Sequence, residues 1–236
     1  MWLQSQILNG MADNRSATDF SESLIYADKS RCLAEQIGDP AGVMRNLAFA
    51  MTMNLQFGDY RASLDAVAQA FELLDQARLS PRHIWPFFAD GSLIFLKLGL
   101  PAAALDFQRE ALRLAFQSQW PLLVCRSYTR LGQIHDGQAD YAQALRHLRL
   151  ALDESRKISL SNGQMNLTAY AWLQLGQAHL GDGDFRQALV CFERAGSEFE
   201  QLKVLFGLYY SRKGRVQALL RLGQNDEAQQ ELDRRP

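Results

Sequence analysis

Apolar, small and aromatic side chains recur along this chain in one fixed order, and the order returns about every 40 residues. The clearest copy runs through Trp172, Leu175, Gly176, His179, Gly183, Phe185, Ala188, Phe192 and Ala195. The copy before it runs through Tyr128, Leu131, Gly132, His135, Tyr141, Ala144, Leu148 and Ala151. Apolar positions spaced by three and four residues are typical of helices that bury one face. The pattern therefore predicts pairs of amphipathic helices.

The boundaries of these helices are marked by proline, glycine and aspartate. The residues that open the second helix of each pair are separated by 40, 41, 40, 44 and 40 residues, and they are Phe20, Tyr60, Pro101, Tyr141, Phe185 and Asn225. Prolines 40, 81, 101 and 121 stand where a helix can begin, because the first helical residue needs no N–H donor. We predict twelve helices and no strands, over residues 2–13, 18–37, 41–56, 60–78, 82–98, 101–118, 121–137, 140–158, 164–181, 184–201, 203–222 and 224–234.

The ordered motif, together with the residues that mark its helix boundaries, resembles the tetratricopeptide repeat. The resemblance implies an all-α fold, a right-handed superhelical solenoid of about six antiparallel helical hairpins in a single domain over residues 1–236. The repeats would cover residues 1–39, 40–80, 81–120, 121–162, 163–202 and 203–236. Repeats of this length resemble those of bacterial regulatory and signalling proteins, in which such arrays lie beside an output domain.

The composition and net charge indicate which class of partner to expect. The 236 residues carry a net charge of −1 with 22% charged residues, so no general attraction to nucleic acid or to anionic membrane is expected. Cys32, Cys125 and Cys191 are odd in number and fall in three different predicted helices, which favours reduced thiols and a cytoplasmic chain. No secretion signal or membrane segment is predicted. We expect a protein or peptide partner.

In the family, side chains of the first helices line a concave groove, and the resemblance carries this role onto matching positions here. The predicted partner-binding residues are Arg45, Thr52, Arg126, Thr129, Arg130, Gln133, Tyr170, Gln174, Gln177, Tyr210, Lys213, Gln217 and Arg221. Smaller or apolar members of the same stripe are Ala48, Phe49, Ala89, Asp90, Leu93, Asp136 and Leu173. The competing interpretation is that any solvent-facing helical stripe is polar.

One family ligand, a C-terminal carboxylate clamped by co-chaperones of the heat-shock system, is excluded by the residues present. Arg126 and Arg130 match the basic pair of that clamp, but Ala48 and Thr52 replace its lysine and asparagine, and Asp90 would repel a carboxylate.

Several other features are open to two interpretations. His135 and His179 share one motif position, which favours packed histidines over a metal or pH-sensing pair. Residues 202–222 contain five basic residues and no acid, which could steer an acidic peptide or form a solvated face. Pro86 could widen a pocket in the groove, but we favour a connection over residues 79–85, containing His83, and a helix that begins at Pro86.

No metal site, cofactor site or catalytic constellation is predicted from these residues. The sequence thus predicts a non-catalytic scaffold or adaptor that binds a peptide or partner domain. The alternative is a ligand-sensing or peptide-sensing regulatory arm of a larger bacterial protein. Self-association through the terminal repeats, involving Leu232, is a further possibility.

Overall fold

Short local signals begin and end the helices of this protein. Asp59 caps one helix by accepting a hydrogen bond of 2.9 Å from the Ala62 N–H, and Asp39, Asp140 and Asp184 cap others in the same way. Gly58 and Gly223 each adopt a φ of +76°, a left-handed conformation that glycine reaches without strain. The aspartate and glycine residues expected to mark helix boundaries are therefore confirmed in that role at these positions.

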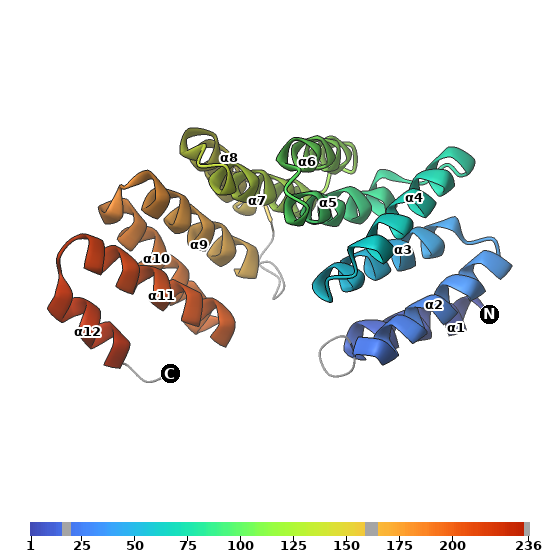
Figure 1. The fold of residues 1–236 in the computed structure, drawn as a ribbon, viewed down its shortest axis with the longest axis horizontal. Coiled ribbons are helices and arrows are strands. Elements are labelled where there is room, and N and C mark those ends of the chain that lie inside the picture. The colour runs from blue at the N-terminus through green and yellow to red at the C-terminus, as the bar shows by residue number, and fades with distance from the viewer. Residues whose placement is uncertain (16–19, 159–164, 234–236) are drawn as a thin grey trace. The chain divides into compact units, whose positions relative to one another are not determined.

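The computed structural model describes residues 1–15, 20–158 and 165–233, and within them all regular structure is helical (Figure 1). The helices are α1 (Trp2–Arg15), α2 (Phe20–Gln36), α3 (Pro40–Gln56), α4 (Tyr60–Gln76), α5 (Pro81–Lys97), α6 (Pro101–Gln117), α7 (Pro121–Gly137), α8 (Tyr141–Ser155), α9 (Met165–Asp182), α10 (Phe185–Gln201), α11 (Leu205–Arg221) and α12 (Asn225–Asp233). This confirms the predicted all-α repeat solenoid. The predicted starts at residues 18 and 164 and the predicted end at 234 lie outside the described residues. The chain divides into two compact units, Met1–Ser118 and Gln119–Pro236.

The first unit packs each helix against the next and α3 against α5. Its core includes the fully buried side chains of Met44, Met51, Phe87 and Ile94. Around this core five phenylalanine rings from α4, α5 and α6 meet mostly edge to face, with centroids 4.7–6.2 Å apart; they are Phe71, Phe87, Phe88, Phe95 and Phe107. Such contacts add to the stability that apolar burial supplies.

The helix predicted over residues 82–98 is confirmed to within a residue at each end, and the interpretation that it begins at Pro86 is wrong. Helix α5 begins at Pro81 and continues through Pro86, so His83 lies in its first turn rather than in a connection. Pro86 has no N–H to donate to the carbonyl of Arg82, so α5 lacks one backbone hydrogen bond there. Gly91 of α5 occupies the glycine position of the motif, and an added Cβ there would lie only 2.9 Å from the ring of Phe107.

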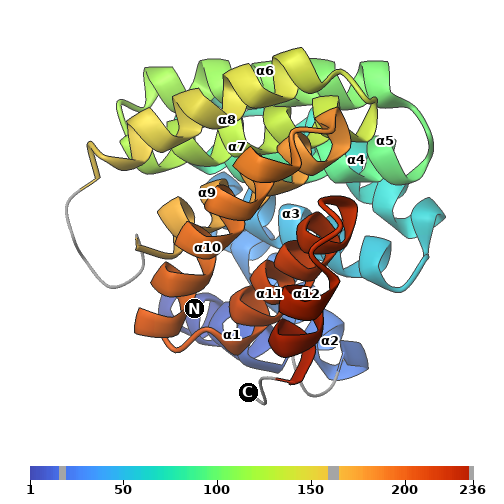
Figure 2. The ribbon, with the colours of Figure 1, turned by 90° about the vertical axis from the view of Figure 1, so that its left-hand side faces the viewer.

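In the second unit α9 contacts α7, α8, α10 and α11, and α11 contacts α12 (Figure 2). The glycines of the motif allow this close approach, because each faces a large side chain of a neighbouring helix. A Cβ at Gly132 would lie 2.5 Å from Leu148, and one at Gly176 would lie 2.7 Å from Phe192. A Cβ added at Gly214 of α11 would lie 2.5 Å from the same Phe192 ring. One ring is thus held between two helices.

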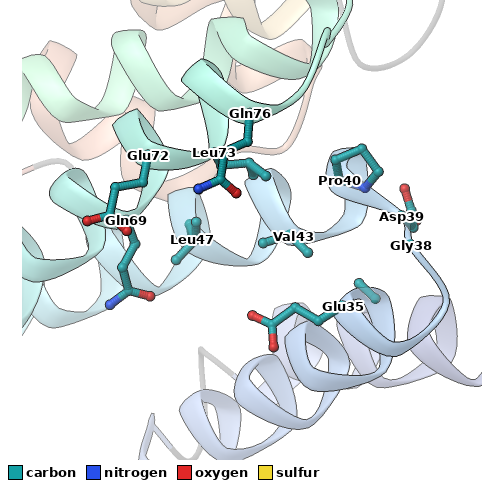
Figure 3. A pocket seen from close by; sticks show the side chains of 11 residues that line it. Glu35, Gly38, Asp39, Pro40, Val43, Leu47, Gln69, Glu72, Leu73 and Gln76 are labelled. Atoms are coloured by element: carbon teal, nitrogen blue, oxygen red, sulfur yellow. The ribbon is translucent and has the colours of Figure 1, made fainter.

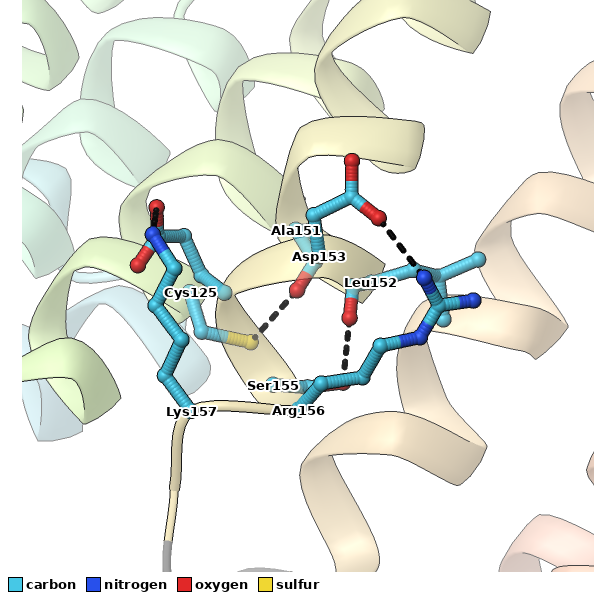
Figure 4. Close-up of polar contacts among 8 residues, drawn as sticks. Cys125, Ala151, Leu152, Asp153, Ser155, Arg156 and Lys157 are labelled. Carbon is cyan, nitrogen blue, oxygen red and sulfur yellow. Dashed lines mark hydrogen bonds and ion pairs between the residues drawn. The ribbon is translucent and has the colours of Figure 1, made fainter.

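The end of α8 is fixed by side-chain contacts to the backbone and along the helix (Figure 4). The Cys125 thiol donates to the Ala151 carbonyl over 3.3 Å, and the Ser155 hydroxyl donates to the Leu152 carbonyl over 2.8 Å. Burial raises the pKa of Cys125 to about 11, so this thiol stays protonated near neutral pH. Cys32, Cys125 and Cys191 are all free.

Candidate functional site

The predicted partner-binding residues of the second unit lie on α7, α9 and α11, the first helices of successive hairpins. Because α9 contacts both α7 and α11, side chains on their shared face come together from three repeats. We call this face of α7, α9 and α11 the recognition face. Each helix contributes positions spaced by three or four residues, which keeps them on one side of that helix.

A chain of hydrogen bonds connects three of the predicted residues across two repeats. A guanidinium N–H of Arg130 donates to the side-chain oxygen of Gln133 over 3.2 Å. The amide nitrogen of Gln133 then donates to the hydroxyl of Tyr170 on α9 over 3.3 Å. These side chains therefore hold one another in place and present a prearranged polar surface.

The other predicted residues of the recognition face differ in exposure. Thr129 is buried and its hydroxyl donates to the Cys125 carbonyl of its own helix over 2.9 Å, so it offers little surface. The remaining predicted residues of α7 and α9, Arg126, Gln174 and Gln177, are exposed or half-buried. On α11, Tyr210 is half-buried, while Lys213, Gln217 and Arg221 are exposed.

Three residues beside this face were not among the predicted partner-binding residues. Leu205, Phe206 and Tyr209, in the first two turns of α11, are among the most exposed large hydrophobic residues of the described chain. The ring centroids of Phe206 and Tyr210 lie 4.5 Å apart, and those of Tyr209 and Tyr210 lie 5.2 Å apart. An apolar residue in a helix is ordinarily assigned to the core, and its exposure depends on neighbours that a sequence pattern does not reveal.

In the first unit the predicted residues Arg45 and Thr52 lie on α3, which contacts α5. They line a pocket of about 240 Å³ together with Ala48, Phe49, Met53, Pro86 and Asp90. Arg45 also donates to the side-chain oxygen of Gln6 over 2.6 Å. Pro86 therefore forms part of a pocket wall, although the helix does not begin there.

A second pocket, of about 600 Å³, shares Thr52 and continues toward the ends of α3 and α5. Its other lining residues are Leu55, Gln56, Phe57, Gly58, Tyr60, Leu93 and Lys97. Of these, only Leu93 was part of the predicted stripe. Tyr60 and Lys97 were missed because the predicted stripe was drawn from the middle of the first helices, whereas Tyr60 opens α4, a second helix, and Lys97 is the last residue of α5.

A third pocket of about 380 Å³ lies away from the predicted residues, between the end of α2, α3 and α4 (Figure 3). Val43, Leu47 and Leu73 form its apolar part, while Glu35 and Glu72 supply carboxylates at its edge. Glu35 is already paired with Arg31 at 2.7 Å. The carboxylate is therefore partly neutralised by its own helix.

His135, His147 and His179 lie in packed positions, whereas His83 is exposed in the first turn of α5. His179 is buried, and that burial lowers its pKa below the usual value. The His135 ring stacks on His147 with centroids 5.3 Å apart, and its Nδ1 atom lies 3.4 Å from a carboxylate oxygen of Asp140. Within the described residues no three histidine, cysteine or acidic side chains converge as a metal site would require. Among the same residues, no helix combines the length and apolar character needed to cross a membrane.

Comparison with known proteins supports the repeat fold. A sequence profile of the tetratricopeptide repeat matches residues 126–158 and 169–195. A search of curated proteins finds no matching relative.

Several solved structures share the fold. BtubC (BKLC) from P. vanneervenii is 15% identical over 92% of this chain and 89% of its own, with a TM-score of 0.77. The apo form of RapI is 11% identical over 98% of this chain, with a TM-score of 0.76, and the match spans 64% of RapI. A Rap protein complexed with Competence and Sporulation Factor is 12% identical over 99% of this chain and 75% of its own, with a TM-score of 0.69. The profile match assigns tetratricopeptide repeats to residues 126–158 and 169–195, and the similar structures show that the chain shares the all-α repeat fold.

Proposed function

We propose that the chain is a non-catalytic scaffold or adaptor that binds a peptide or partner domain on the recognition face. The observation that carries this proposal is the hydrogen-bonded series Arg130, Gln133 and Tyr170, which joins two repeats. A surface whose side chains are already ordered loses less conformational entropy when a partner binds. Tyrosine and arginine are also the residues most often found at energetically important contacts.

In the first unit the two pockets that share Thr52 support the same proposal. Their lining combines apolar side chains with Arg45, Asp90 and Lys97, which suits the side chains of a polypeptide better than a single small polar molecule. The cytoplasm is the location that fits free cysteines and a protein partner.

The test is capture of partners from a cytosolic extract by the purified chain and by the variant Arg126→Ala/Arg130→Ala/Gln177→Ala. The matched control is Arg146→Ala/Arg149→Ala/Gln187→Ala, which removes the same side-chain types from exposed positions of α8 and α10. A protein retained by the wild type and the control but lost from the first variant supports the proposal. Retention of the same proteins by all three chains contradicts it.

A second candidate is a regulatory arm that senses a peptide or small ligand. The observation that favours it is the similarity to a Rap protein solved in complex with Competence and Sporulation Factor, which extends over 99% of this chain. A sensing arm must change conformation when its ligand binds. Small-angle scattering of the chain with and without a captured ligand would distinguish the two, since a scaffold keeps its radius of gyration.

A further inference from the structure

The first two turns of α11 carry a group of exposed apolar side chains that the repeat packing does not use. Leu205 is 72% exposed, Phe206 68% and Tyr209 61%. Together with the half-buried Tyr210 we call these residues the aromatic platform. Contiguous exposed apolar surface on a folded chain commonly marks a place where another molecule binds.

The rings of the platform are held by one another. Phe206 and Tyr210 have centroids 4.5 Å apart, and Tyr209 meets Tyr210 nearly at right angles, at 87° and 5.2 Å. Phe206, Tyr210, Lys213 and Gln217 follow one another at spacings of four, three and four residues, so they share one side of α11. The platform therefore extends the recognition face toward the start of this helix.

The charged residues of α11 itself are all basic, whereas the end of the preceding α10 carries Glu198 and Glu200. Residues 202–222 include Lys203, Arg212, Lys213, Arg215 and Arg221 and no acidic residue. Lys213 Nζ lies 5.9 Å from the centre of the Tyr210 ring, and the exposed Lys203 stands two residues before Leu205. The Arg215 guanidinium forms ion pairs with Glu193 and Glu231, so its charge is already engaged. Two lysines thus flank the platform.

We propose, as a deepening of the proposed function, that the aromatic platform docks an acidic polypeptide segment that carries an exposed apolar side chain. The apolar side chain packs on Phe206, Tyr209 and Leu205, and the flanking carboxylates meet Lys203 and Lys213. Charge complementarity at such a surface speeds association and rejects basic competitors.

A polypeptide fits this surface better than single-stranded nucleic acid. Binding of nucleic acid draws much of its affinity from several phosphate contacts along a basic groove. Here only two lysines flank the rings, the exposed Leu205 offers no face for base stacking, and the whole chain carries a net charge of −1.

The test begins with a displayed library of short random peptides, selected on the full wild-type chain. We expect the selected peptides to be enriched in aspartate and glutamate around one leucine or aromatic residue. Their synthetic forms should bind Lys203→Glu/Lys213→Glu at least about tenfold more weakly than wild type. Phe206→Ser should cause a similar loss. The matched controls are Arg186→Glu and Val190→Ser, exposed positions of α10 that should leave affinity unchanged.

The remaining outcomes separate this proposal from the proposed function. The platform proposal is overturned if the selected peptides lack acidic enrichment. It is also overturned if their binding is insensitive to the α11 variants but is abolished by Arg126→Ala/Arg130→Ala. The proposed role of the recognition face is not contradicted by either result. No selected peptide above background counts against both. Binding of single-stranded polyuridine that depends on Phe206, in place of acidic peptides, also overturns the proposal. Circular dichroism must show that each variant keeps the wild-type helical content.

Discussion

The side-chain amide of Gln133 donates a hydrogen bond to the hydroxyl of Tyr170, a residue 37 positions later in the chain. The bond joins the first helices of two successive repeats on their exposed face. Because water competes for both groups there, the bond contributes more to the arrangement of the surface than to the stability of the fold.

Tyr170→Phe tests that distinction. The ring is kept and only the hydroxyl is lost, so we expect the free energy of unfolding to fall by less than about 1 kcal/mol. Capture of the partner should weaken more clearly, because Gln133 and Arg130 lose the contact that orients them. Urea unfolding and a pull-down with the same preparation measure the two effects. A large loss of stability with unchanged capture would show that the bond is structural.

Gly176 of α9 is expected to be sensitive to substitution, because it is buried against Phe192. Gly176→Ala places a methyl group against the Phe192 ring and should lower the free energy of unfolding by about 1–3 kcal/mol, and Gly176→Leu should unfold at least this repeat. Gly196 of α10 provides the control, since its added Cβ would meet Ser211 at an ordinary 3.6 Å. Gly196→Ala should be neutral or stabilising by up to about 1 kcal/mol. The thermal unfolding midpoints of Gly176→Ala and Gly196→Ala test this difference. Equal changes in the two midpoints would refute the packing explanation.

Arg215 joins three helices, because it reaches Glu193 of α10 at 3.5 Å and Glu231 of α12 at 3.2 Å from its own position on α11. Glu231 is almost fully buried, so Arg215→Ala leaves a carboxylate without its ion-pair partner. We expect a loss of about 3 kcal/mol in local stability, seen as faster amide exchange in α12. The double variant Arg215→Met/Glu231→Leu should recover most of the protection. If it does not, the ion pair is not what holds α12.

His179 should make stability depend on pH. Burial lowers the pKa of His179 below its ordinary value of 6.5, so the unfolded chain binds a proton before the folded chain does. Its contribution is complete above about pH 6.5 and is lost as the pH falls through the lowered pKa. The urea concentration at the midpoint of unfolding should therefore decrease when the pH is lowered from about 7.5 to about 5.5. His179→Gln should show a smaller fall, and an identical fall would assign the effect to other groups.

The hairpins could be read from the sequence because their boundaries are set locally. A proline can begin a helix and an aspartate can cap one whatever lies nearby, so helices such as α3, α6 and α10 start within a residue of the expected position. For α5 the local rule held at Pro81, which occupies the first helical position, and the error was to apply it to Pro86 instead. The single solenoid domain over residues 1–236 stays a prediction.

The candidate site was only partly predictable. The repeat motif shows which side of a first helix is free, and it thereby brought together Arg130, Gln133 and Tyr170. It could not show that Thr129 is covered or that Phe206 is exposed, because both depend on how closely neighbouring helices approach. The buried pair Ser92 and Gln108, whose side chains lie 3.2 Å apart, is a further case, since nothing local indicates that a glutamine sits in the core.

The ring of Phe192 lies between Gly176 and Gly214, and so acts as a spacer between α9 and α11. The separation of these two helices, and with it the width of the surface that they present, is fixed by the size of one aromatic ring. Phe192 itself is fully buried and offers no surface to a partner. A change of this residue would therefore retune which partners fit the surface without altering any side chain that contacts them.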